Sequence, residues 1–224
     1  METLYQALRL LHIGAGMTAF FVAPVALLAR KGGPVHAFWG QVFFWGMVVV
    51  AASAVPMTFL RPNVFLFLVA VFSFHLSWSG YRAVKRRRAT DPARAARTDL
   101  VVAAGMVLFY VALAGWGVYL FTGQPHHPFG YVSLAFAGIG LRFSGVEIYH
   151  HFKPRGDRMA WWYDHMQGMA GSYIAAVSAF SAVNFSMLPD ALRWLWPTLL
   201  GAPLLAYWKR HYQRKFRGPP ARPA

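Results

Sequence analysis

Long apolar stretches alternate with short polar gaps along this chain. Seven of the stretches reach the roughly 20 residues that a helix needs to cross about 30 Å of hydrocarbon. They cover approximately residues 4–29, 36–60, 63–82, 99–121, 128–150, 160–184 and 191–208. We therefore predict an all-α fold, a single domain of seven transmembrane helices within residues 1–208. Pro197 and Pro203 interrupt the last stretch, where a re-entrant or interfacial helix also fits.

The positive charges lie in alternate gaps of this pattern. The chain carries 22 Lys and Arg against 7 Asp and Glu, a net charge of +15. Most of the cations follow the odd-numbered stretches, within 30–31, 82–97, 153–158 and 209–222. The other side has only Arg9, Arg61 and Arg193. Arg142 lies inside the fifth stretch. Under the positive-inside rule the richer side is cytoplasmic, which places the N-terminus outside and a basic tail, 209–224, in the cytoplasm.

The composition agrees with a chain that lives in lipid. It is 57% hydrophobic and 13% charged, whereas soluble domains are about 45–50% apolar and about 25% charged. The chain has no nucleic-acid motif, so its positive charge indicates membrane orientation rather than nucleic-acid binding. The absence of Cys excludes disulfides, thiolate metal sites and iron–sulfur clusters. We predict a multi-pass protein of the bacterial cytoplasmic (inner) membrane.

Ionisable side chains inside the apolar stretches are the candidates for function, because a charge in hydrocarbon is costly unless it has a partner or a cavity. His75 lies seven residues before Arg82, and His165 lies seven after Arg158. Each is therefore about 10 Å inside the cytoplasmic boundary. The same side also holds His36, Glu147, His150, His151 and Asp164. The pattern predicts a histidine cluster in the cytoplasmic half of the bundle.

Two neutral imidazoles from facing helices can bind a b-haem iron, while the other nitrogen of each ring donates to a nearby acceptor. We predict His75 and His165 as this ligand pair, with His36 and His150 as substitutes. Arg142 lies about 12 Å deep and could clamp a haem propionate, a quinone oxygen or a substrate carboxylate, or snorkel to the headgroups. The predicted function is electron transfer to a quinone or a membrane redox partner. The same histidines also fit a purely structural role as hydrogen-bonding groups between helices.

Three other functions fit the same residues. A zinc-dependent membrane hydrolase would use the cluster as metal ligands and a carboxylate as general base. Its candidate ligands are His36, His75, His150, His151, His165, Glu147 and Asp164. A small-molecule transporter would lead its substrate past His12, His75, Arg142 and Glu147. An accessory or assembly subunit of a membrane complex would hold neither haem nor metal.

The sixth stretch combines polar groups with small side chains. Gly168, Gly171, Ser172 and Ala175 predict a face on which another helix packs closely. Met169 lies one turn after His165, and a thioether in an apolar helix usually fills space. The sequence therefore predicts a helix-packing face on the sixth helix.

Two segments carry a resemblance to a known family. Residues 30–47 read Arg-Lys-Gly-Gly-Pro-Val-His-Ala-Phe-Trp-Gly-Gln-Val-Phe-Phe-Trp-Gly-Met, and residues 161–176 read Trp-Trp-Tyr-Asp-His-Met-Gln-Gly-Met-Ala-Gly-Ser-Tyr-Ile-Ala-Ala. They resemble a bacterial family of predicted multi-pass membrane proteins classed as a domain of unknown function. In that family a His after a Gly-containing turn opens one helix and Trp-x-x-x-His opens another, and His36 and His165 occupy those positions. The resemblance implies the multi-helix topology and assigns no activity.

Overall fold

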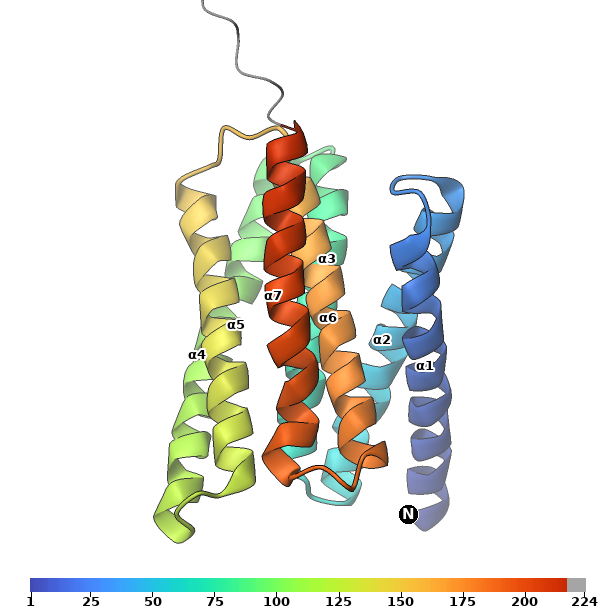
Figure 1. The fold of residues 1–224 in the computed structure, drawn as a ribbon, viewed down its shortest axis with the longest axis vertical. Coiled ribbons are helices and arrows are strands. Elements are labelled where there is room, and N and C mark those ends of the chain that lie inside the picture. Colours follow the sequence, from blue (N-terminus) through green and yellow to red (C-terminus); the bar gives the residue numbers. More distant parts are fainter. Residues whose placement is uncertain (217–224) are drawn as a thin grey trace, which may run out of the picture.

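A computed structural model describes residues 1–216, without the side chain of Arg94. Within that range the chain forms seven α-helices that run alternately up and down (Figure 1). They are α1 (Glu2–Leu28), α2 (Pro34–Leu60), α3 (Val64–Arg87), α4 (Pro92–Gly123), α5 (Pro128–Phe152), α6 (Ala160–Asn184) and α7 (Asp190–Phe216). The predicted all-α bundle of seven helices is confirmed.

Five of the helices in the described part of the chain, α1 to α5, are long and apolar enough to cross a membrane. The protein is therefore a multi-pass integral membrane protein. Helices α6 and α7 have 25 and 27 residues, which at about 1.5 Å per residue exceeds the hydrocarbon thickness. They contain no stretch as apolar as those in α1 to α5, with Asp164 and Gln167 in α6 and a basic end on α7. That they also cross the membrane stays a prediction.

Helix α7 agrees with the predicted helix at its two prolines and differs from it at the C-terminal end. It runs without a break through Pro197 and Pro203, and its packing on α6 and α5 supports it where the prolines remove hydrogen bonds. It also continues to Phe216 instead of ending at residue 208, because Lys, Arg and Gln are good helix formers outside the membrane as well. Much of the predicted basic tail, 209–224, is thus helical, and residues 217–224 lie outside the described residues.

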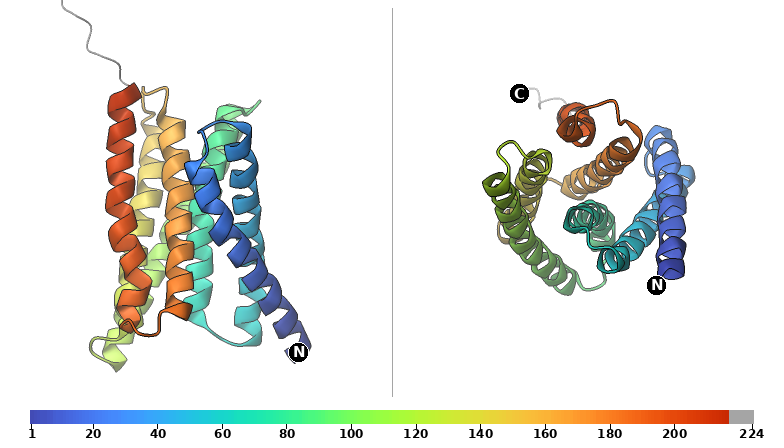
Figure 2. Two further views of the ribbon diagram at one scale, coloured as in Figure 1. Left: turned by 45° about the vertical axis from the view of Figure 1, so that its right-hand side comes forward. Right: turned by 90° about the horizontal axis from the view of Figure 1, so that it is seen from below.

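The helices form two hairpins around a central pair. Helices α1 and α2 pack along each other, as do α4 and α5, while α3 and α6 pair in the middle. The view along the bundle shows the α1–α2 and α4–α5 hairpins on opposite sides of α3 and α6 (Figure 2). Helix α7 packs on α6 and touches α5. The two hairpins therefore face each other across a core that α3 and α6 supply.

The central pair is held by an unusually close backbone approach. A Cβ atom added to Gly168 would lie 2.5 Å from the backbone nitrogen of Gly80. One added to Gly80 would lie 2.6 Å from the backbone nitrogen of Met169. One turn further along, Ser172 Oγ donates to the carbonyl of Ser73 at 3.1 Å. The small face predicted on the sixth stretch is thus the surface that meets α3.

Candidate histidine pair at the basic end of the bundle

His36 and His165 meet across the interior of the bundle. His36 lies in the first turn of α2, which starts at Pro34 after a turn that Gly32 makes with a φ of 78°. His165 lies in the second turn of α6. Their ring centroids are 6.1 Å apart and their planes cross at 82°. Two segments more than a hundred residues apart in sequence therefore bring two imidazoles together.

Both rings are oriented by a backbone carbonyl. The Nδ1 atom of His36 lies 2.9 Å from the carbonyl oxygen of Ala26, and Nδ1 of His165 lies 2.9 Å from that of Gly80. A carbonyl oxygen only accepts hydrogen bonds, so Nδ1 of each neutral ring carries the proton and donates it. The Nε2 atom of each ring then holds a free lone pair. Metal-binding histidines in proteins are usually oriented in this way.

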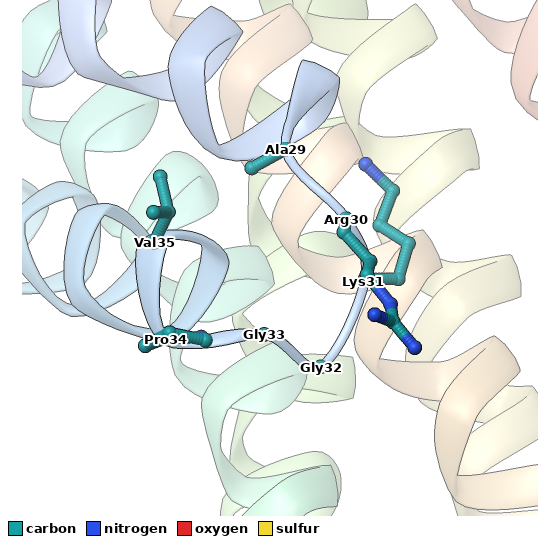
Figure 3. Close-up of a pocket in the computed structure, with 7 residues that line it drawn as sticks. All are labelled: Ala29, Arg30, Lys31, Gly32, Gly33, Pro34 and Val35. Carbon is teal, nitrogen blue, oxygen red and sulfur yellow. The ribbon is translucent and has the colours of Figure 1, made fainter.

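A cationic turn lies beside the pair. Residues 29–35 between α1 and α2 line a pocket of about 430 Å³ (Figure 3). The Lys31 side chain folds back toward the end of α1, where its ammonium donates to the carbonyls of Leu27 and Ala26, while Arg30 extends the other way (Figure 3). Partial burial lowers the pKa of Lys31. Its charge also acts electrostatically on His165.

His75 belongs to a different network. Its ring is only 3% exposed, and its Nδ1 atom lies 2.8 Å from the hydroxyl of Tyr110. Its Nε2 atom lies 3.5 Å from a carboxylate oxygen of Glu147, whose other oxygen accepts from Ser79. If the Tyr110 hydroxyl donates to Nδ1, the proton lies on Nε2 on the side of the Glu147 carboxylate. At 3.5 Å this contact is not a hydrogen bond, so Nε2 is buried without a hydrogen-bond partner among the described residues. This network ties α3, α4 and α5 together.

The predicted pair His75 and His165 is therefore not the pair that meets. Both side chains are near the basic end, as their depth in the sequence implied, but His75 faces α4 and α5 whereas His165 faces α2. Distance along a helix gives depth, and it does not give the direction in which a neighbour lies. His36, predicted as a substitute ligand, is the histidine whose ring lies next to that of His165.

The ligand set predicted for zinc is not assembled. In residues 1–216 no group of three or more His, Asp and Glu side chains is arranged to hold a metal ion. His150 approaches the carbonyl of Lys153 at 3.3 Å, and the ring of His151 contacts its neighbour Phe152. Both are at the last turn of α5, where solvent and headgroups are within reach.

Asp164 is held in an ion-pair network. Arg155 Nη2 donates to its two carboxylate oxygens at 2.6 and 2.5 Å, and Arg86 lies 3.6 Å from it. Arg86 also pairs with Asp99 at 2.7 Å, as does Arg82 at 2.8 Å. The network joins α3, α4 and α6 with the connection before α6. Asp164 is thus engaged as a structural anion rather than available as a general base.

Within residues 1–216, no hydrogen bond or ion pair joins Arg142 to the histidines discussed above. Its side chain is exposed on α5, and it acts electrostatically on Lys209 of α7, whose ammonium donates to Gln167 at 2.8 Å. The proposed transport path is also divided, because His12 lies near the opposite end of the bundle, where its Nδ1 atom is 3.0 Å from the carbonyl of Val50. The structure brings together only His75 and Glu147 of that path.

Several groups at these sites carry no signal in the sequence. Tyr110 and Ser79 are an aromatic residue and a small residue in apolar helices, and nothing in their spacing marks them as partners of His75. The carbonyls of Ala26 and Gly80 are backbone atoms, so no residue type announces them. By contrast, the Gly-Gly-Pro turn before His36 could be predicted from the sequence.

Comparison with protein-family models, with curated proteins and with solved structures gives no match to this chain. Its resemblance to a family of unknown function therefore stays a prediction, and its role has to be inferred from the geometry of its own side chains.

Proposed function

We propose that this membrane protein binds b-haem through the Nε2 atoms of His36 and His165 and passes electrons to a quinone or a membrane redox partner. The observation that supports the proposal is the separation of the two rings. A metal–nitrogen bond of about 2 Å places the centroids of two opposed imidazole ligands about 6 Å apart, and the observed distance is 6.1 Å. Because each ring plane contains its own nitrogen–metal axis, a crossing angle of 82° is compatible with this arrangement.

The surroundings of the pair favour a redox cofactor over a simple packing contact. Each Nδ1–H is bound by a carbonyl, which fixes the orientation of the ring and makes Nε2 more basic. Lys31 and Arg30 would offer cations to the propionates at the edge of the bundle. Bound b-haem supplies one-electron chemistry, and the residues of this chain would set its position and potential.

The proposal includes an orientation in the bacterial cytoplasmic membrane. The turn between α1 and α2, the connection between α3 and α4, and the end of α7 all lie at one end of the bundle (Figure 1). These are the segments rich in Lys and Arg. The positive-inside rule favours that end as cytoplasmic, so the histidine pair lies in the cytoplasmic half.

The test is a visible spectrum of detergent-purified protein, oxidised and dithionite-reduced, together with metal analysis, after expression with adequate haem supply. We expect a sharp α-band on reduction in the wild type. His36→Ala and His165→Ala should each abolish the band, because each residue would supply one of the two nitrogens that hold the haem.

His150→Ala is the matched control, since His150 lies at the same end of the bundle but contacts neither ring, and it should retain the band. If the wild type holds stoichiometric metal without haem, the haem proposal fails. A colourless and metal-free wild type also contradicts it and leaves transport or complex assembly as the function.

A further inference from the structure

The few cations at the opposite end of the bundle gather around one cavity. Arg9, Arg61 and Arg193 are the Lys and Arg residues that the charge pattern places on that side. They come from α1, from the residue that ends α2, and from the first turn of α7. All three line the same cavity. Cations on the outer side are disfavoured by the positive-inside rule, so their convergence calls for a local reason.

The cavity has the size and lining of a ligand site. Its volume is about 970 Å³, close to the upper end of the about 300–1,000 Å³ of small-molecule pockets. It lies between the α1–α2 hairpin and α3, α6 and α7, and its walls are mostly apolar, with side chains such as Phe20, Met47 and Leu66. Figure 2 shows α1 leaning away from the rest of the bundle toward its N-terminal end, and Tyr5 and Arg9 of that part of α1 line the cavity.

The three arginines are not equally neutralised. Arg61 makes a bidentate pair with Glu2 at 2.9 and 2.8 Å. Arg193 pairs with Asp190 and donates to the carbonyl of Ala182 at 3.3 Å. Arg9 has no ion pair or hydrogen bond to any residue that the structure describes. The rim of an apolar cavity therefore carries one cation whose charge no described residue offsets.

We propose that this cavity binds an amphipathic anion, with a carboxylate or phosphate head at Arg9 and an apolar chain along α3 and α6. A guanidinium pairs with both headgroups through two parallel hydrogen bonds. The apolar walls match a hydrocarbon chain. The site is at the other end of the bundle from His36 and His165, so it stands independently of haem binding.

Binding of oleate and of oleyl alcohol to the purified full-length protein tests the charge requirement. The two ligands share one chain and differ in the carboxylate. We expect saturable binding of oleate and at least about tenfold weaker binding of oleyl alcohol, because the alcohol cannot form a charge-assisted hydrogen bond with Arg9. Arg9→Gln should weaken oleate about tenfold and leave oleyl alcohol unchanged.

Two further variants separate the cavity from the rest of the surface. Ala179→Phe introduces a ring into the cavity lining and should weaken both ligands. Arg142→Gln removes an exposed cation at a distance from the cavity and should change neither affinity. Equal affinity for the two ligands, or oleate binding that Arg9→Gln does not affect, would overturn the proposal.

Competition identifies the source of the anion. Dioleoyl phosphatidylglycerol that displaces oleate with the same dependence on Arg9 assigns the site to a membrane phospholipid. If unlabelled oleate displaces labelled oleate and the phospholipid does not, the site is assigned to a free fatty acid. Both results require the anionic head at Arg9, which distinguishes them from nonspecific partitioning of the chain.

Discussion

Gly168→Ala should destabilise the bundle strongly. The added Cβ would lie 2.5 Å from the nitrogen of Gly80, 2.6 Å from its Cα and 2.7 Å from the carbonyl oxygen of Leu76. All three are backbone atoms, so no side chain can rotate out of the way and α3 must move away from α6. Overpacking of this kind costs about 1–3 kcal/mol and in a rigid backbone contact more. Thermal unfolding of the detergent-purified variant measures the loss.

Gly171→Ala provides the control on the same helix. Its added Cβ would meet only the side chain of Leu76, at 3.5 Å, which is ordinary van der Waals contact. Both substitutions gain the same helix propensity, about 1 kcal/mol in favour of Ala, so the difference between them reports the backbone contact alone. Equal unfolding temperatures for the two variants would mean that α3 and α6 do not approach as closely as described.

Gly168→Ala should also disturb the pair formed by His36 and His165. His165 is one turn before Gly168 on α6, and its ring donates to the carbonyl of Gly80 on α3. Separating the helices lengthens this hydrogen bond and frees the ring to turn. If the haem proposal holds, Gly168→Ala should lower haem retention in the fraction that still folds, whereas Gly171→Ala should not.

Removing the hydroxyl of Tyr110 should also lower the free energy of unfolding substantially. Tyr110 is fully buried, and its hydroxyl is 2.8 Å from Nδ1 of His75. Tyr110→Phe leaves that nitrogen buried without a partner, which costs about 1–3 kcal/mol. His75→Ala should cost more, about 2–5 kcal/mol, because it also opens a cavity in the core. Unfolding in denaturant, with folding reversible in detergent, measures both.

The double variant and a surface control identify the cause. If the hydrogen bond carries the effect, the cost of Tyr110→Phe should largely disappear in a His75→Ala background, since the two residues then share one interaction. Tyr119→Phe removes a hydroxyl from the same helix at a site 68% exposed and should be neutral. Independent, additive costs would show that His75 and Tyr110 do not form a coupled pair.

These variants also separate the two histidine sites. Tyr110→Phe should keep the reduced α-band, because Tyr110 contacts His75 and lies outside the His36–His165 pair. A band lost in Tyr110→Phe while the protein stays folded would return His75 to the role of ligand that its depth in the membrane first indicated.

The architecture follows from the sequence because lipid imposes few choices. In hydrocarbon the backbone must satisfy its own hydrogen bonds, so an apolar run of sufficient length forms a helix. The seven helices could therefore be predicted with errors only at their ends, as where α7 continues to Phe216. The packing face of the sixth stretch could also be predicted from the sequence, because small residues such as Gly168 and Ser172 allow a neighbouring helix to approach closely.

What only the tertiary structure decided is which polar groups meet. His36, His75 and His165 share one depth range, and a helix turns 100° per residue, so small changes in packing angle select different partners. The contact between Gly80 and Gly168 sets α3 against α6, which turns His165 toward His36 and leaves His75 to Tyr110 and Glu147. Helix packing also brings three arginines, Arg9, Arg61 and Arg193, to one cavity. The sequence by itself determined the helices and the depth of each polar group, and helix packing determined the neighbours.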